Sequence, residues 1–384
     1  MTSPCIVALD AMGGDFGPDV VVPGAAISAV RHPGIRFLMF GDEARIKPLL
    51  DKHPALASRT EVFHTTHVIG MTDKPSQAIR RGKGSSMWMA LEAVREGRAE
   101  VAVSAGNTGA LMALYRLLLK PIGDIERPAI AAIWPTVKAE SIVLDVGANI
   151  GADARQLCDF ALMGAGMARA LFHIERPKVG LLNVGVEEIK GAEEVKAAHG
   201  VLKDTEGLPL DYQGFVEGDD IGLGKVDVIV VEGFAGNIAL KTAEGTARQI
   251  GTWLKEAMTG SFTAKLGAML AQGGFRALKR KMDPRRINGG TFLGHNGIAI
   301  KSHGGTDALG FASAVDLGYD MASSGLVKRL ASDLQAFQGK LKAGLEAAEA
   351  KDAKAAAARA EAAKAGAKAL ESKPVETKAG ASGS

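Results

Sequence analysis

Short apolar runs alternate along this chain with longer segments of helical periodicity. The runs are rich in Val, Ile and Leu, and most are followed directly by glycine, aspartate or asparagine. Strands that are apolar throughout are typical of sheets buried on both faces, and strand–helix alternation is typical of parallel βαβ units. The pattern therefore predicts a doubly wound α/β/α sandwich with a mostly parallel sheet. The predicted strands cover residues 6–9, 35–40, 101–104, 142–144, 179–182 and 226–231.

Glycine-rich loops follow nearly all of these strands. Folds of this type bind ligands beyond the carboxyl ends of their strands, and glycine lets the backbone approach a ligand closely. The loops therefore predict one glycine-lined cleft. They read AMGGDFGP (11–18), SAGNTGA (104–110), DVGANIG (145–151), NVGVEEIKG (183–191), EGFAGN (232–237) and HGGTDALG (303–310).

Two regions depart from this pattern. Residues 250–288 have a helical spacing unlike the rest of the chain, and from about Gln335 onward Ala, Lys and Glu dominate. A helix that is polar on most of its faces has little surface to bury. We therefore expect a single catalytic domain over residues 1–335. Residues 336–384 are expected to form a helical or disordered tail outside the fold.

Composition narrows the class of protein. A net charge of +3 over 384 residues argues against a nucleic-acid partner. Cys5 and Cys158 are far apart and lack a redox or metal-binding spacing, which predicts reduced core thiols in a cytoplasmic protein. No apolar run approaches the roughly 20 residues that a bilayer-spanning helix needs.

Several common catalytic motifs are missing. The sequence has no P-loop, no GxGxxG after the first strand and no GxSxG elbow. We therefore expect no cofactor, no metal site and no covalent nucleophile. The first loop instead offers an anion site, because Pro18 predicts a helix start whose free N–H groups, beside Gly13 and Gly14, can hold phosphate. A tight turn without a ligand explains these residues equally well.

Polar side chains on the other loops suit holding an anion and polarising a carbonyl group. Lys190 can neutralise phosphate or a developing oxyanion, although a solvated surface lysine explains it as well. The carboxylates could instead cap helices. The remaining candidates are Asp10, Asn107, Asp145, Asn149, Asn183, Glu187, Asn237 and His303.

Together these loops resemble the phosphate acyltransferase family, PlsX. The matching stretches run in one order from about Ile6 to Met321, and the tail lies outside them. They include ALDAMGGDFGP, MTDKPSQAIRRGKGSSM, SAGNTGALMA, RPAIAAIWPT, LDVGANIGADARQLCDFALMG, NVGVEEIKGAEEV, EGFAGNIALKT and GGTFLGHNGIAIKSHGGTDALGFASAV.

The resemblance implies transfer of an acyl group from acyl carrier protein to inorganic phosphate, early in bacterial phospholipid synthesis. It implies a Rossmann-like fold related to the isocitrate and isopropylmalate dehydrogenases and to phosphotransacetylases. It also implies a homodimer that contacts the inner face of the cell membrane. There, a membrane-embedded glycerol-3-phosphate acyltransferase would use the acyl phosphate product.

The absence of a nucleophile suits this chemistry, because phosphate can attack a thioester directly. We expect Lys190 and Asn237 nearest the reacting centre, as donors to phosphate or to the oxyanion. His303 is expected to donate a hydrogen bond or to protonate the leaving thiolate. Gly13, Gly14 and Asn107 would complete the anion cradle, with Asp10 and Asp145 orienting donors.

Two basic segments are candidate docking surfaces. Lys74, Arg80, Arg81 and Lys83 could receive the acidic carrier protein, or form a solvated helix end. Residues 253–286 combine an apolar helical stripe with a basic cluster. Anionic membrane surfaces attract segments with this combination. A core or dimer interface explains the stripe as well. The candidate membrane contacts are Phe262, Leu266, Leu270, Arg276, Lys279 and Arg280.

Two other functions remain open. A nicotinamide-dependent dehydrogenase of the related fold would need a fingerprint that the sequence lacks. A non-catalytic scaffold for acyl carrier protein and membrane partners would not need six polar glycine loops. The apolar residues of the sequence do not indicate which acyl-chain length the protein prefers.

Overall fold

The strands join into one sheet that is mostly parallel, as the sequence predicts. The computed structural model describes residues 4–281, 283, 285 and 288–371. The strands are β1 (Ile6–Asp10), β2 (Arg36–Gly41), β3 (Thr60–His64), β4 (Val101–Ser104), β5 (Ala129–Pro135), β6 (Glu140–Leu144), β7 (Lys178–Leu182), β8 (Asp211–Val216), β9 (Val228–Val230), β10 (Gly290–Leu293) and β11 (Ile298–Lys301). Their order in the sheet is β3-β2-β1-β4-β11-β10-β5-β6-β9-β7-β8. The pairs β5–β6, β5–β10 and β10–β11 are antiparallel, and the other neighbours are parallel.

Helices cover both faces of this sheet, which confirms the α/β/α sandwich. They are α1 (Pro18–Arg31), α2 (Glu43–Leu50), α3 (Pro54–Ala57), α4 (Pro75–Arg81), α5 (Ser86–Arg95), α6 (Thr108–Leu118), α7 (Ala154–Phe172), α8 (Glu193–Asp204), α9 (Asp220–Leu223), α10 (Gly233–Thr259), α11 (Phe262–Leu270), α12 (Gln272–Lys281), α13 (Ala308–Ser323) and α14 (Leu326–Glu371). One core joins the sheet to α1, α7, α8, α13 and α14, and a second joins it to α4, α5 and α6.

The two cores explain why apolar runs mark the central strands. Successive side chains of a strand point to opposite faces. Val7 and Leu9 accordingly lie in one core and Ala8 in the other. All six predicted strands overlap observed ones, namely β1, β2, β4, β6, β7 and β9. The pattern misses the edge strands β3 and β8, which are only partly buried, and also the central strands β5, β10 and β11.

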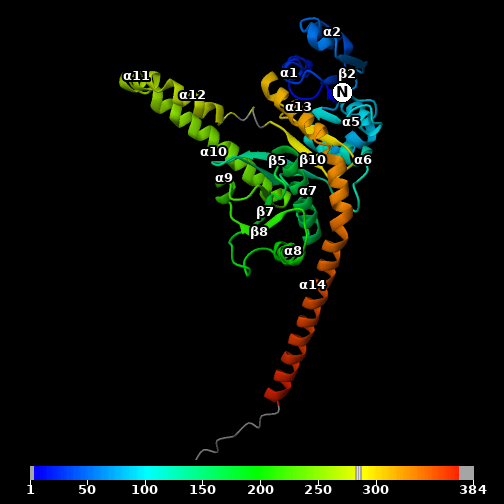
Figure 1. Cartoon of the computed structure of the whole chain (residues 1–384), viewed down its shortest axis with the longest axis vertical. Coiled ribbons are helices and arrows are strands. Elements are labelled where there is room, and N and C mark those ends of the chain that lie inside the picture. Colours follow the sequence, from blue (N-terminus) through cyan, green and yellow to red (C-terminus); the bar gives the residue numbers. More distant parts are fainter. Residues whose placement is uncertain (1–3, 282, 284, 286–287, 372–384) are drawn as a thin grey trace, which may run out of the picture.

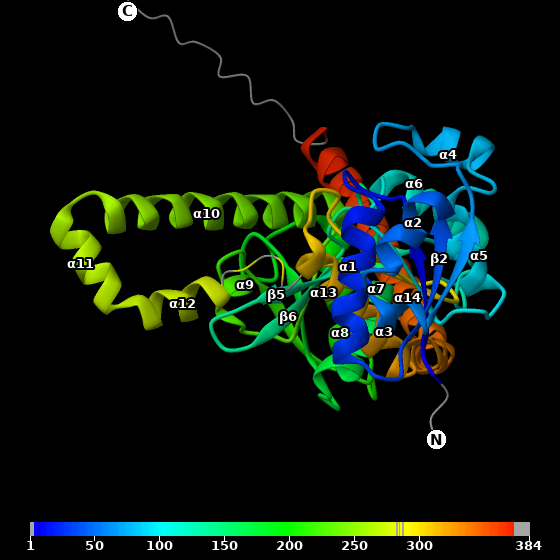
Figure 2. The same cartoon turned by 90° about the horizontal axis from the view of Figure 1, so that it is seen from above.

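The helices α10, α11 and α12 form an arm that projects from the sandwich (Figures 1 and 2). The helical spacing of residues 253–286 thus agrees with the structure as far as Lys281, where α12 ends. On α10 the buried residues are Gly233 and Gly236, both in its first turn, and α11 has no buried residue. In the described part of the chain, no helix has both the length and the apolar character to cross a bilayer.

The boundary expected at residue 335 falls inside a continuous helix. α14 packs against α7 and α8, and it buries Gln338, Leu341 and Leu345 beyond that boundary. The tail therefore contributes to the fold for about three helical turns before α14 leaves the body (Figure 1). The sequence pattern does not reveal this packing, because the leucines on the buried face of α14 are outnumbered by small and charged residues.

Candidate functional site

Three glycine loops meet at the carboxyl ends of β1, β4 and β11. The backbone N–H of Asp15 donates to the carbonyl of Gly304 at 3.0 Å. Gly14 has a φ of +87°, and a Cβ there would lie 2.9 Å from both the Ala105 side chain and the Gly304 carbonyl. Only glycine permits this closure, because other residues rarely adopt such a φ and the space is filled.

Asp10 lies beneath these loops and is fully buried. Its Oδ2 accepts a hydrogen bond of 2.6 Å from Ser104, whose hydroxyl in turn accepts from the N–H of Gly106 at 3.0 Å. Among the described residues, Asp10 Oδ1 has no hydrogen-bond partner. Burial raises the pKa of Asp10, and the Ser104 hydrogen bond partly opposes that shift. Asp10 is thus placed to orient the backbone of the glycine loop after β4.

Asn107 anchors a neighbouring loop. Its Oδ1 accepts from Ala110 at the start of α6, and its Nδ2 donates to the carbonyls of Met71 at 2.7 Å and Asp73 at 3.0 Å. Both amide hydrogens are therefore engaged within the chain. The Asn107 side chain caps a helix and fixes residues 71–73, so any contact with an anion would involve the backbone of its loop.

Asp145 organises a second group of loops, after β6. Its two oxygens accept backbone hydrogen bonds from Ile130, Gly147, Ala148 and Asn149, and one also accepts from the Asn149 amide at 2.9 Å. Burial raises the pKa of Asp145, and the hydrogen bonds act in the opposite direction. Asn149 also donates to the carbonyl of Pro128. Both residues therefore shape the backbone of this loop.

The EGFAGN segment begins a helix rather than forming a loop. Glu232 caps α10 by accepting from the N–H groups of Phe234 and Ala235, so Asn237 lies in the second turn of the helix. A Cβ on Gly236 would lie only 1.9 Å from the carbonyl oxygen of Asp145. This close approach places Asn237 against Gly147 in the loop after β6. Our placement of Asn237 on a loop was therefore wrong.

α10 connects the two groups of loops. Asn237, Lys241 and Glu244 recur at helical spacing, and Glu244 Oε1 lies 3.7 Å from His303 Nε2. Burial lowers the pKa of His303, and Glu244 opposes that shift. The first turns of α10 therefore run from the loop after β6 to the loop after β11, which carries His303 as expected.

The loop after β7 is more exposed. Lys190 Nζ donates to Glu187 at 2.9 Å, and this hydrogen bond raises the pKa of Lys190. Asn183 donates to the carbonyls of Gly185 and Lys190 and so holds the loop closed on itself. In the described residues, the side-chain hydrogen bonds of this trio stay within the loop. Lys190 is thus solvent-accessible and does not point into an enclosed cavity.

The structure adds two residues that the sequence patterns miss. Asn288 is buried, and its Oδ1 accepts from the backbone of His303 while its amide donates to Ser302 and Gly310. Lys301 ends β11 and donates to the carbonyls of Ala105 and Ser302. The apolar run before Lys301 is short and lies between glycine-rich segments. It therefore carries little signal as a strand.

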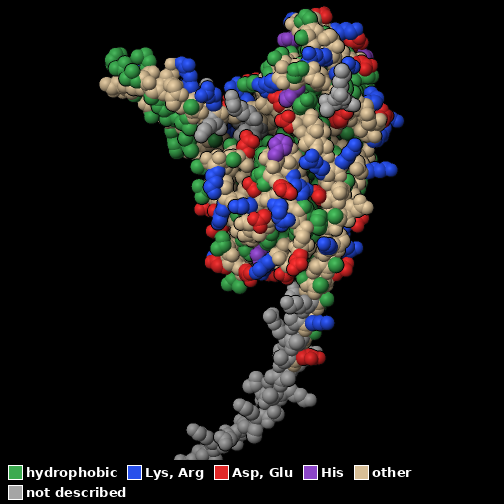
Figure 3. Space-filling model, in the orientation of Figure 1, with side chains coloured by type: hydrophobic (Ala, Val, Ile, Leu, Met, Phe, Trp, Pro, Cys, Tyr) green, Lys and Arg blue, Asp and Glu red, His purple; other side chains and the backbone are tan. Residues whose placement is uncertain are grey.

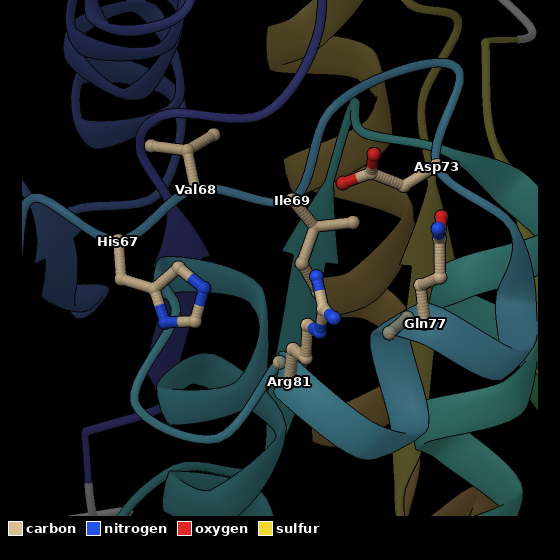
Figure 4. Close-up of a pocket in the computed structure, with 8 residues that line it drawn as sticks. His67, Val68, Ile69, Asp73, Gln77 and Arg81 are labelled. Atoms are coloured by element: carbon tan, nitrogen blue, oxygen red, sulfur yellow. The ribbon is translucent and has the colours of Figure 1, made fainter.

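The basic segment near α4 is exposed beside a small pocket. Lys74, Arg80, Arg81 and Lys83 are exposed, and Arg81 lines a pocket of about 170 Å³ with His67, Ile69, Asp73 and Gln77. Figure 4 shows His67 and Ile69 on the loop before α4, and Gln77 and Arg81 on the helix. α4 packs on α6, whose first residues adjoin Asn107. The basic surface therefore lies near the loop after β4.

The arm exposes the apolar side chains that the sequence selects. Phe262 and Leu270 are 83% and 81% exposed, and Leu266 is also exposed. Figure 3 shows apolar side chains gathered along the arm and at its outer end. Arg276 and Arg280 are exposed on α12, whereas the Lys279 side chain lies outside the described part. Arg285 pairs with Asp283 and Asp307 rather than adding a free charge to this cluster.

Residues 5–329 match the family described as "Fatty acid synthesis protein". The chain is 60% identical over 336 residues to a phosphate acyltransferase of Agrobacterium fabrum, covering 87% of this chain and 95% of that protein. A phosphate acyltransferase of Rhizobium meliloti is likewise 60% identical over 335 residues, covering 87% and 96%.

Solved structures show the same fold at low identity. A phosphotransacetylase of Streptococcus pyogenes superposes with a TM-score of 0.55 at 16% identity, covering 84% of this chain and 95% of that one. The EutD phosphotransacetylase of Staphylococcus aureus gives 0.53 at 16% identity, covering 83% and 94%. Because these matches cover most of its length, the chain belongs to the fatty acid synthesis protein family, a family of acyltransferase enzymes.

Proposed function

We propose that this chain transfers an acyl group from the thioester of acyl carrier protein to inorganic phosphate, forming acyl phosphate for phospholipid synthesis. The observation that carries the proposal is the meeting of three glycine loops after β1, β4 and β11, joined by α10 to the loop after β6. The phosphate acyltransferases with 60% identity support the reaction class. Neither a dehydrogenase nor a scaffold has a comparable observation in its favour.

The reaction needs no covalent intermediate on the protein. A phosphate oxygen forms a bond to the thioester carbonyl carbon, and the carbon–sulfur bond then breaks with its electron pair on sulfur. The departing thiolate takes up a proton from a nearby donor or from solvent. Because a thiolate is a good leaving group, positioning and charge stabilisation can provide most of the acceleration.

The residues divide into those that touch the substrates and those that shape the loops. Lys190 and Asn237 bind phosphate or the oxyanion. His303 donates a hydrogen bond or a proton to the leaving sulfur. The backbone at Gly13 and Gly14 completes the anion cradle. The loop-shaping residues are Asp10, Asn107, Asp145, Asn149, Asn183 and Glu187, whose hydrogen bonds support that role.

Two exposed surfaces serve the partners. Acyl carrier protein docks on the basic residues Lys74, Arg80, Arg81 and Lys83, beside the pocket at α4. The arm lies on the cytoplasmic face of the membrane through Phe262, Leu266 and Leu270, with Arg276 and Arg280 near anionic headgroups. A peripheral position brings acyl phosphate close to a membrane-embedded glycerol-3-phosphate acyltransferase. The chain acts as a homodimer, and exposed Ile250 and Trp253 on α10 offer surface for a second copy.

The proposed function is tested with the purified full chain, palmitoyl acyl carrier protein and inorganic phosphate. Hydroxylamine traps acyl phosphate as a hydroxamate, and free carrier thiol is measured in parallel. We expect both products to appear in equal amounts and only with phosphate present. Thiol release without phosphate would indicate a thioesterase, and accumulation of an acylated protein that turns over would refute direct attack.

A further inference from the structure

Lys301 occupies a central place that the proposed mechanism does not use. It is the last residue of β11, which lies beside β4 in the middle of the sheet. Its Nζ donates to the carbonyl of Ala105 at 3.3 Å and to the carbonyl of Ser302. Ala105 directly follows β4 and Ser302 directly follows β11. One amine therefore ties together the loops that leave two adjacent parallel strands.

Both tethered loops carry residues of the candidate site. Gly106 and Asn107 follow Ala105 and lead into α6, while His303 and Gly304 follow Ser302. The Gly304 carbonyl accepts from Asp15, so the loop after β1 joins the same assembly. A change at Lys301 would thus reach all three glycine loops without a direct contact to substrate.

The charged groups that face Lys301 come from several elements. Asp10 from β1 and Asp15 from the following loop stabilise the ammonium form, and Lys241 from α10 opposes it. His303, on the loop after β11, lies 3.7 Å from Glu244 of α10. Burial outweighs the carboxylates and lowers the pKa of Lys301 to about 8. An ordinary lysine keeps its proton until well above this pH.

We propose that Lys301 is a positioning residue, whose ammonium group holds the loops after β4 and β11 in the arrangement that binds inorganic phosphate. The inference relies on the proposed function for the identity of the anion. Loss of the proton leaves only neutral hydrogen bonds to the two carbonyls, which are weaker than charge-assisted ones. It also removes a positive charge from beneath the anion-binding loops.

The test measures binding of inorganic phosphate to the full chain by isothermal titration calorimetry at about pH 7 and about pH 9.5, on either side of the Lys301 pKa. Relative to Lys301→Arg, the wild-type dissociation constant should rise on the order of tenfold at the higher pH, as expected for loss of one charge-assisted hydrogen bond. Lys301→Arg should show only the pH dependence that ionisation of phosphate itself produces, because a guanidinium stays charged. Lys301→Met should bind weakly at both.

The control is Lys47→Met, which removes an exposed lysine paired with Glu43 on α2 and should behave as the wild type. In the acyl transfer assay, Lys301→Met should raise the KM for phosphate more than it lowers kcat. A purely structural role would instead lower kcat through loss of folded enzyme, which circular dichroism would detect. Lys301→Arg keeps the test informative if Lys301→Met does not fold.

Two results would overturn the inference: no phosphate binding by the wild type, or a change in affinity between the two pH values that is the same in the wild type and in Lys301→Arg. Because binding is measured without acyl donor, failure of the proposed function is a separate result. A chain that binds phosphate with the expected pH dependence, yet forms no acyl phosphate, keeps the inference and refutes the proposed reaction.

Discussion

The polar side chains of the site differ in how many of their hydrogen bonds are already made within the chain. Asn107 uses both amide hydrogens within the chain, and both oxygens of Asp145 accept several backbone hydrogen bonds. Lys190 is instead exposed and pairs with exposed Glu187. An exposed ion pair contributes little to stability, so its ammonium group can leave Glu187 for an anionic substrate at small cost. This availability favours Lys190 as a group that touches substrate.

Replacing Lys190 tests that role. We expect Lys190→Ala to lower kcat/KM for acyl transfer on the order of a hundredfold, as does removal of one donor that stabilises an oxyanion. Lys196→Ala is the matched control, since Lys196 also pairs with a glutamate, Glu193, on α8. Initial rates at varied phosphate give both constants. Near-normal turnover of Lys190→Ala at saturating phosphate would remove Lys190 from the mechanism.

At the scale of elements, one buried side chain joins α14 to α7. Gln338 of α14 donates to Asp159 of α7 at 3.1 Å, and its Oε1 accepts from the N–H of Asp124 at 3.0 Å. Burial raises the pKa of Asp159 to about 7, and the Gln338 hydrogen bond opposes the shift. Packing of α14 on the sandwich is therefore coupled to the protonation of one carboxyl group.

This coupling predicts a pH dependence of stability. The folded-state pKa of Asp159 lies above the unfolded value, so its contribution is fully present below the unfolded pKa and is lost as pH rises through about 7. The effect reaches at most about 1.4 kcal/mol per pH unit in that window. The asparagine of Asp159→Asn cannot ionise. As the pH rises from about 4 to about 7, the free energy of unfolding of this variant should therefore increase relative to that of the wild type.

Urea unfolding of both proteins across this range measures the difference. Asp204→Asn, an exposed substitution at the end of α8, controls for the chemical change. Parallel stability curves for the wild type and Asp159→Asn would show that the carboxyl group is not coupled to folding as described.

At the scale of the whole molecule, α10 connects the site to the end of the arm. Asn237 and Glu244 lie near its base, and the helix then extends over 27 residues, about 40 Å. Exposed Phe262 and Leu270 follow in α11, away from the sandwich (Figure 2). The exposed basic residues of α4 form a separate surface. The surfaces proposed for carrier docking and for membrane contact are therefore separate.

A crossed experiment tests whether the two surfaces act independently. Arg80→Glu with Arg81→Glu should raise the KM for acyl carrier protein about tenfold and leave flotation with anionic phospholipid vesicles unchanged. Leu266→Glu should abolish most vesicle flotation, because a charge must enter the apolar layer, and should leave the KM for carrier protein unchanged. Vesicle binding that survives Leu266→Glu would refute the membrane role of α11. An unchanged KM in the arginine variant would refute carrier docking at α4.

Much of the architecture and several site residues follow from local patterns. Apolar runs predict six of the eleven strands, whose side chains are buried on both faces of the sheet, and glycine marks the turns where backbones pack closely, as at Gly14. The motifs predict the family, and the loop position of His303 is correct. Local patterns fail where an element is short or partly exposed, as in β3 and β11, or where small residues conceal the apolar face of α14. They also miss β5 and β10, although both strands are largely buried.

The sequence by itself determined which residues follow each of the six predicted strands, because strand patterns and glycine turns are local properties. Tertiary structure alone decided which of those loops meet. β4 pairs with β11, so Ser104 lies opposite Lys301, far away along the chain, and Gly236 brings Asn237 against the loop after β6. These contacts depend on strand order and close packing, and no local pattern of apolar and polar residues specifies either.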